Sequence, residues 1–121
     1  MNFYIIFLLL SFINMPMPGT TFKKSIEVPF FGGQIIETEF KKFNNVEIRL
    51  SGYVNENGTA KFSLKNEDID IKLSENLNTV LKKYRTDFIL ESYDPINQII
   101  EIKLIIKPIF LKKKVELIRI K

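Results

Sequence analysis

The chain has 121 residues, a formal net charge of +4 and 45% apolar residues, which is enough for one domain with a single core. It contains no His, Cys or Trp, so thiol catalysis, Ser-His pairs, zinc sites that use His or Cys, and disulfides are all excluded. The lysines occur in short scattered runs, which indicates a solvated surface rather than a nucleic-acid groove.

The N-terminal segment is an apolar run from Phe3 to Ile13 that stops before Pro16. Its length of about 11 residues fits a secretory signal and is well short of the ~20 residues that a spanning helix needs. No basic residue precedes Lys23, so a buried terminal strand or an uncleaved anchor stays open as the alternative. We predict a signal peptide or short anchor at residues 1–19 and one domain at residues 20–121.

Two segments are expected before the middle of the chain. Residues 23–31 alternate weakly and contain Pro29, which predicts an extended or edge segment. After a Gly-Gly break, residues 34–43 have apolar side chains at helical spacing with charged residues between them. This pattern predicts an amphipathic helix of about three turns. Its apolar positions are Ile36, Phe40 and Phe43.

A β-hairpin is predicted from Asn45 to Leu64, where apolar and polar residues alternate on both sides of a break. The break is Asn55-Glu56-Asn57-Gly58, and Asn-Gly is the strongest short hairpin signal. We therefore place the hairpin tip at residues 55–58. Asn57-Gly58-Thr59 also matches a glycosylation sequon, but turn geometry alone explains the Asn-Gly pair.

The returning strand is expected to continue past a kink, because Ile69, Ile71 and Leu73 alternate with polar residues. The nearby acids lack the glycine and the terminal Glu of a calcium loop, so we interpret them as a solvated strand face. These acids are Glu67, Asp68 and Asp70.

The clearest helix signal follows directly. Ser74 is a suitable N-cap, and Glu75 places a carboxylate in the first turn, where it complements the helix dipole. Apolar residues then recur at helical spacing, and Leu81 is expected to be a core contact. The apolar positions are Leu77, Val80, Leu81 and Tyr84.

The C-terminal third is predicted to be extended. Residues 88–93 form one strand, Asp94-Pro95-Ile96-Asn97 fits a type I turn, and residues 98–107 form the longest strand. Pro108 interrupts this strand, and residues 109–121 predict one more. The predicted fold is therefore α+β, with two helices packed on one face of a three- to four-stranded antiparallel sheet.

Four motifs follow one another along the chain: Pro29-Phe30-Phe31-Gly32-Gly33, Val54-Asn55-Glu56-Asn57-Gly58, the Leu77–Tyr84 helix and Lys107-Pro108-Ile109-Phe110. Their order resembles the C-terminal domain of TonB-type energy transducers, over residues 27 to 112. The Tyr-Pro and Trp-x-Pro segments usual in that family are absent. Only about ten residues separate Met17 from Val28, which span about 35 Å at most and are too short for a periplasm-crossing linker.

This resemblance implies an exported binding module, periplasmic, secreted or anchored in the inner membrane, that pairs with an extended partner segment by β-strand addition. The partner would be a protein. In the TonB family the partner is an outer-membrane receptor, so the resemblance also implies a link to transport. The resemblance places the contact on the last long strand. Its partner-binding residues would be Gln98, Ile99, Ile100, Glu101, Ile102, Lys103, Leu104 and Ile105.

Two alternatives stay open. The tail from Val115 to Ile120 would cover this strand if it paired with it. Separately, the chain would be a structural or assembly protein of the cell envelope with the same α+β fold, whose exposed strands serve assembly and not transport. We predict no enzyme activity, because the acids show no paired site. We also predict no cofactor, no metal and no nucleic-acid partner.

Overall fold

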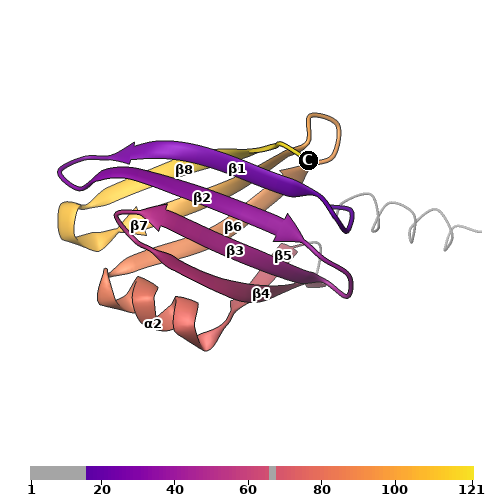
Figure 1. Cartoon of the computed structure of the whole chain (residues 1–121), viewed down its shortest axis with the longest axis horizontal. Helices are drawn as coiled ribbons and strands as arrows, with labels where there is room; N and C mark the ends of the chain where they lie inside the picture. The colour runs from indigo at the N-terminus through magenta and orange to yellow at the C-terminus, as the bar shows by residue number, and fades with distance from the viewer. Residues whose placement is uncertain (1–15, 66–67) are drawn as a thin grey trace, which may run out of the picture.

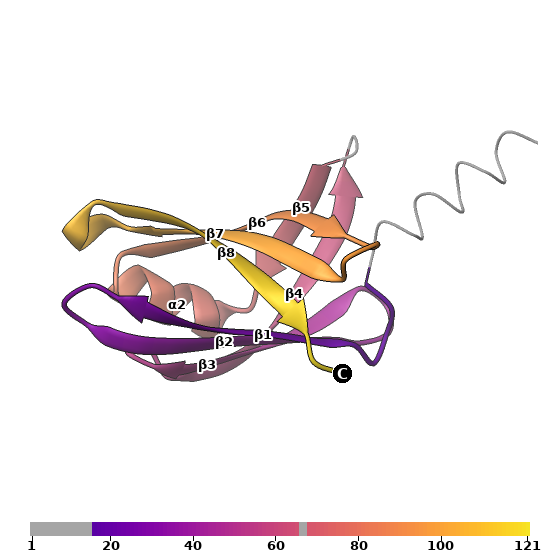
Figure 2. The same ribbon diagram turned by 90° about the horizontal axis from the view of Figure 1, so that it is seen from above.

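The computed structural model describes residues 16–65 and 68–121, so the predicted leader up to residue 15 lies outside the described residues. Within these residues, eight strands form one antiparallel sheet in the order β5-β4-β3-β2-β1-β8-β7-β6. Figure 1 shows β1 to β4 side by side, and Figure 2 shows the sheet folding over into a nearly closed barrel. The strands are β1 (Thr21–Val28), β2 (Gly32–Phe40), β3 (Asn45–Gly52), β4 (Glu56–Lys65), β5 (Asp68–Leu73), β6 (Thr86–Asp94), β7 (Ile99–Ile106) and β8 (Leu111–Arg119).

Within the described part of the chain, α2 (Glu75–Lys83) is the one α-helix and η1 (Lys107–Ile109) is a single 3-10 turn. α2 packs against β4 and β6 (Figure 1). No helix in residues 16–65 and 68–121 is long and apolar enough to cross a membrane.

The predicted α+β fold with two helices on a three- to four-stranded sheet is therefore wrong. The predicted first helix, residues 34–43, is strand β2 followed by a turn. Ile36 and Phe40 are buried, but Phe43 is 89% exposed and lies in that turn with a φ of 61°. Because this helix is absent from the described residues, the α+β architecture that the resemblance to TonB domains implied is wrong as well.

The inward-facing side of β2 includes polar as well as apolar side chains, and together they have the spacing of a strand. Gln34, Ile36, Thr38 and Phe40 all point inward at a spacing of two. The Gln34 amide is satisfied by the β3–β4 turn: its Oε1 accepts the Val54 N–H at 2.7 Å, and its Nε2 donates to the Val54 carbonyl at 3.1 Å. A buried polar group with such partners costs little, so the strand tolerates Gln34 inside.

The predicted hairpin is confirmed as the antiparallel pair β3 and β4, but its predicted tip is wrong. The turn lies three residues earlier, between Gly52 and Glu56. Gly52 has a φ of 128°, and the Asn55 side chain accepts from its N–H at 3.0 Å and donates to its carbonyl at 2.8 Å. Asn57 and Gly58 lie inside β4, which also removes the turn explanation of the sequon.

Gly58 instead makes room for α2. It pairs with Ile48 in the sheet, and a Cβ built on it would lie 2.7 Å from both Leu77 Cδ1 and Ser74 Oγ. Leu77 is 1% exposed, so it has no open space into which to move. The glycine is thus explained by the close approach of helix to strand.

β5 is a separate strand, antiparallel to β4, rather than a continuation of it past a kink. The polypeptide connecting the two includes Glu67, which lies outside the described residues. The described residues contain no group of acidic side chains that could hold a metal ion.

The remaining elements follow the sequence signals. Ser74 occupies the N-cap position of α2, as predicted, but its side chain makes no capping hydrogen bond and its Oγ accepts from the Thr59 N–H at 3.2 Å. Leu77 and Leu81 are buried, as predicted. The Asp94 turn is confirmed: its Oδ1 accepts from the Ile96 N–H at 3.0 Å and the Asn97 N–H at 3.1 Å. Hydrogen bonds from Asn97, side chain first, lower the pKa of Asp94. The long strand is confirmed as β7, and the tail forms β8.

The interior of the curled sheet is filled with side chains. Phe22 contacts Phe40 and Tyr93 edge-on, with ring centroids 5.6 and 6.0 Å apart, so one residue links β2 to β6 across the core. Phe40 in turn meets Phe62 of β4 at 5.4 Å. The largest fully buried side chains are Phe22, Ile36, Ile48, Leu77, Ile100, Ile102 and Leu117.

Candidate functional site

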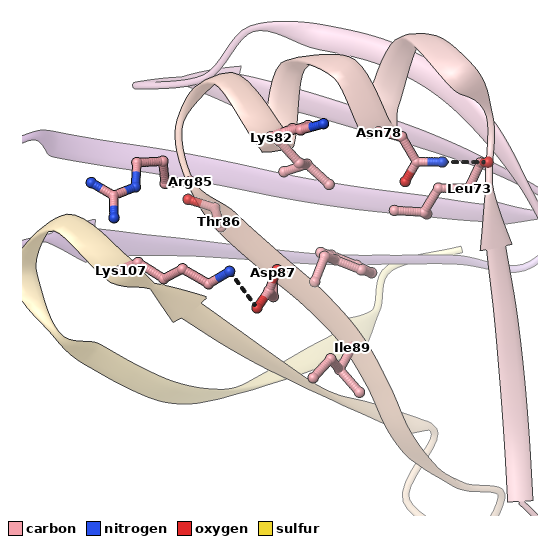
Figure 3. Close-up of a pocket in the computed structure, with 10 residues that line it drawn as sticks. Leu73, Asn78, Lys82, Arg85, Thr86, Asp87, Ile89 and Lys107 are labelled. Atoms are coloured by element: carbon pink, nitrogen blue, oxygen red, sulfur yellow. Dashed lines mark hydrogen bonds and ion pairs between the residues drawn. The ribbon is translucent and has the colours of Figure 1, made fainter.

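A cavity of about 700 Å³ lies where the sheet fails to close, between β5, α2 and β6 (Figure 3). Within the described residues, no backbone ladder joins β5 to β6, which are the two outer strands of the sheet. We call this space the wedge. It is lined by Leu73, Asn78, Leu81, Lys82, Arg85, Thr86, Asp87, Phe88, Ile89 and Lys107.

The wedge has an apolar floor. Leu81 is buried, and Leu73 and Phe88 are half-buried and pack against the core. Asn78 holds one corner, because its Nδ2 donates to the Leu73 carbonyl at 3.1 Å and ties α2 to the end of β5 (Figure 3). A ligand entering the wedge would meet hydrophobic surface that the protein itself leaves partly uncovered.

The wall of the wedge is basic. Lys107 Nζ lies 3.6 Å from Asp87 Oδ2, so these two side chains largely offset each other (Figure 3). Among the side chains that the structure describes, which leave out those of residues 64–70, Lys82 and Arg85 have no salt-bridge partner. Lys82 also complements the C-terminal dipole of α2, which is a structural reason for one of the two charges. The remaining positive charge on the wall of the wedge still favours an anionic ligand.

β6 turns a free backbone edge toward the wedge. Lys107 N donates to the Arg85 carbonyl at 3.1 Å, and hydrogen-bonded positions alternate along an antiparallel pair. Asp87 therefore bonds to β7, whereas the N–H and C=O groups of Thr86 and Phe88 point away from β7. Within the described residues, β6 forms a ladder with β7 on one side and none on the other, where β5 and α2 pack near it without pairing.

The strand predicted to bind the partner lies between two other strands of the sheet. Gln98 is in the turn before β7 with a φ of 54°, and residues 99–105 belong to β7. β7 pairs with β6 on one side and with β8 on the other, including Ile102 with Val115. The tail therefore covers β7, as the alternative held, and the free edge is one strand away.

Of those eight residues, three face the core, four lie on the outer face and Gln98 is in the turn. Ile100, Ile102 and Leu104 are buried, and their neighbours in sequence are half-buried on the outer face. Sequence reasoning missed the wedge residues Lys82 and Arg85, because basic residues at a helix end already have an explanation in the dipole. Only the strand order reveals that they flank an open edge.

A second cleft, of about 480 Å³, lies between β1 and β8. These strands pair only at Phe22 with Arg119 and Lys23 with Ile118, and then separate. The cleft has equal numbers of basic and acidic side chains, and Lys114 pairs with Glu101 at 3.5 Å. It therefore offers no preference for a charged ligand. Its charged residues are Lys24, Lys113, Lys114, Glu27, Glu101 and Glu116.

An ion cluster on the outer face of β2 and β3 is satisfied internally. Arg49 contacts Glu37, Glu39 at 3.1 Å and Glu47 at 3.2 Å. Lys41 reaches Glu47 at 2.9 Å. Hydrogen bonding to Glu37 chiefly raises the pKa of Arg49, and hydrogen bonding to Lys41 chiefly lowers the pKa of Glu47. The cluster stabilises the sheet and leaves little charge for a ligand.

Replacing Glu47 with glutamine tests this cluster through its pH dependence. Because the pKa of Glu47 is lowered from its ordinary value of 4.5, its stabilising effect is present above that pH and is lost as the pH falls through the lowered pKa. Urea unfolding should show Glu47→Gln less stable than the wild type near neutral pH, by at most about 1 kcal/mol, with the difference shrinking in acid. Glu116→Gln, on β8 and outside the cluster, is the control. A difference that grows in acid would contradict the pairing.

No family model, curated protein or solved structure matches this chain. The comparisons therefore do not bear on the resemblance to TonB domains, and function must be argued from the geometry of the chain itself.

Proposed function

We propose that the chain is a binding protein that takes an extended acidic segment of a partner protein into the wedge, by adding it as a strand to the free edge of β6. The observation that carries the proposal is the coincidence of two features at one place. The backbone groups of Thr86 and Phe88 have no strand partner in the described residues, and Lys82 and Arg85 line the same space.

Each part of the wedge has a role in this binding mode. The edge of β6 supplies backbone hydrogen bonds, which give affinity without regard to sequence. The side chains of an added strand alternate between two faces. One set would lie on the floor formed by Leu81 and Phe88, and the other would carry the carboxylates that Lys82 and Arg85 attract.

The net charge of +4 favours the same class of partner, because it draws acidic segments toward the protein at long range. Export remains a prediction from the apolar N-terminal run. Together these features favour an envelope or extracellular protein with an exposed acidic strand or tail as the partner.

The proposal is tested by reversing one charge on either of two adjacent lysines. Lys82 lines the wedge, whereas the Lys83 ammonium lies over the Tyr84 ring at 5.8 Å and is not part of the lining. Lys82→Glu and Lys83→Glu change net charge and helix dipole equally. The probe is a short peptide that alternates valine with glutamate, titrated by calorimetry. Lys82→Glu should weaken binding about tenfold, and Lys83→Glu should leave it near the wild-type value.

A peptide with lysine in place of glutamate is the ligand control and should bind poorly. Equal weakening by the two variants would mean that net charge alone attracts the peptide, and this would contradict a site at the wedge. Failure of the wild-type protein to bind the valine–glutamate peptide would contradict the proposal directly.

A further inference from the structure

Two phenylalanine rings project into solvent from turns at one end of the molecule. Phe30 lies in the β1–β2 turn and is 94% exposed; Phe110 follows η1, before β8, and is 95% exposed. Figures 1 and 2 both place these two turns at the same end of the sheet. Large apolar side chains this exposed usually mark contact surfaces when they occur together.

The backbone at both positions disfavours phenylalanine. Phe30 has a φ of 71° and Phe110 a φ of 53°, in the left-handed region where glycine and asparagine are far more comfortable than bulky residues. Stability alone would select a different residue at each turn. Strained, exposed residues of this kind are concentrated at functional surfaces.

The core does not need either ring. Beneath these turns, the Phe31 ring stacks on Tyr53 at 4.4 Å, and Tyr53 meets Tyr84 edge-on at 4.9 Å. Ile109 packs partly against the core as well. These side chains already close this end of the barrel, so Phe30 and Phe110 extend beyond a finished surface.

Basic residues lie close to the second ring in the sequence. Lys112 is exposed and follows Phe110 by two residues, and Lys113 comes next. Lys107 and Lys114 are near as well, but they are paired with Asp87 and Glu101. The opposite end also exposes Phe43, beside Lys42, and Ile96. There, however, Lys41 is paired with Glu47 at 2.9 Å, and the Asp94 carboxylate closes the turn that holds Ile96. Apolar rings beside lysines match the chemistry of a lipid surface with anionic headgroups.

We propose that this end of the molecule docks on an anionic membrane surface, with the Phe30 and Phe110 rings entering the interface and Lys112 contacting lipid phosphates. Burial of the two rings supplies the apolar part of the binding. The lysines supply a charge-dependent part that salt weakens. The inference uses a different surface from the wedge floor and does not depend on the strand-addition proposal.

The absence of tryptophan makes a direct test possible. Phe30→Trp, Phe110→Trp and Phe43→Trp each create a single fluorescent reporter in the full chain. Phe43 is the matched control, since it is also exposed, also at positive φ, and lies in the β2–β3 turn at the other end (Figure 1). With phosphatidylcholine vesicles containing about 30% phosphatidylserine, the reporters at 30 and 110 should shift to the blue and be quenched by brominated lipid. The reporter at 43 should not change.

A second variant measures the contribution of the rings. The double variant Phe30→Asn/Phe110→Asn keeps residues that accept positive φ, so the turns are retained. Its binding in vesicle sedimentation should fall by at least about tenfold. The apolar N-terminal run is common to all variants, so binding through it alone would leave the reporters at 30 and 110 unshifted and overturn the proposal. Equal binding to pure phosphatidylcholine vesicles, or an equal response at position 43, would overturn it as well.

Discussion

Replacing Phe22 with alanine is expected to cost about 3–5 kcal/mol of unfolding free energy, a large share of the 5–15 kcal/mol typical of a domain. Phe22 is 0% exposed, and its ring contacts both Phe40 of β2 and Tyr93 of β6. Removing it leaves a cavity at the point where the two halves of the curled sheet meet. Neighbouring side chains are held by their own strands and cannot collapse far into that space.

Urea unfolding followed by circular dichroism measures this loss. Phe43→Ala is the matched control, because it removes the same ring from a position that is 89% exposed. We expect the control to change stability by less than about 0.5 kcal/mol. A cost for Phe22→Ala below about 1 kcal/mol would contradict a core that links β2 to β6.

Replacing Gly58 with valine is the second change expected to be severe, at about 3 kcal/mol or more, since overpacking of a filled core typically costs 1–3 kcal/mol for smaller insertions. Even a Cβ at this position would lie 2.7 Å from Leu77 Cδ1 and from Ser74 Oγ. The valine would force α2 away from β4. Thermal unfolding and urea unfolding should both show the loss.

A double-mutant cycle with Leu77→Ala separates this explanation from a general intolerance of valine. Leu77→Ala alone should destabilise the protein, because Leu77 is 1% exposed. In that background the clash with Leu77 is relieved and only the close approach to Ser74 Oγ remains, so the valine should cost about 1–3 kcal/mol less than in the wild type. Strict additivity of the two changes would mean that Gly58 and Leu77 are not in contact.

Local signals allowed the helix α2 and the strands β3, β6 and β7 to be predicted. β2 was missed because its apolar residues are ambiguous. Ile36 and Phe40 are four residues apart, a spacing that suits one face of a helix and equally one face of a strand. The choice between a helix and a strand depended on Phe43, which is exposed, and on Gln34, which is buried. A buried glutamine is explained by its bonds to Val54, a contact across twenty residues that periodicity cannot show.

The hairpin tip was misplaced for a related reason. Asn57-Gly58 has the composition of a turn, but Gly58 is needed because Leu77 packs on it from a helix that begins seventeen residues later. The wedge could not be predicted at all. Whether β7 or β6 is the outer strand depends on the pairing of β8 with both β7 and β1, and strand order is a property of the whole sheet.

Amide hydrogen exchange along β6, with and without the valine–glutamate peptide, tests the proposed binding mode most directly. In the free protein, the Asp87 amide should exchange slowly because it bonds to β7, and the Thr86 and Phe88 amides should exchange fast. Saturating peptide should slow exchange at Thr86 and Phe88, because the added strand accepts their hydrogen bonds. Continued fast exchange at both positions under saturating peptide, or new protection confined to another strand, would contradict strand addition at β6.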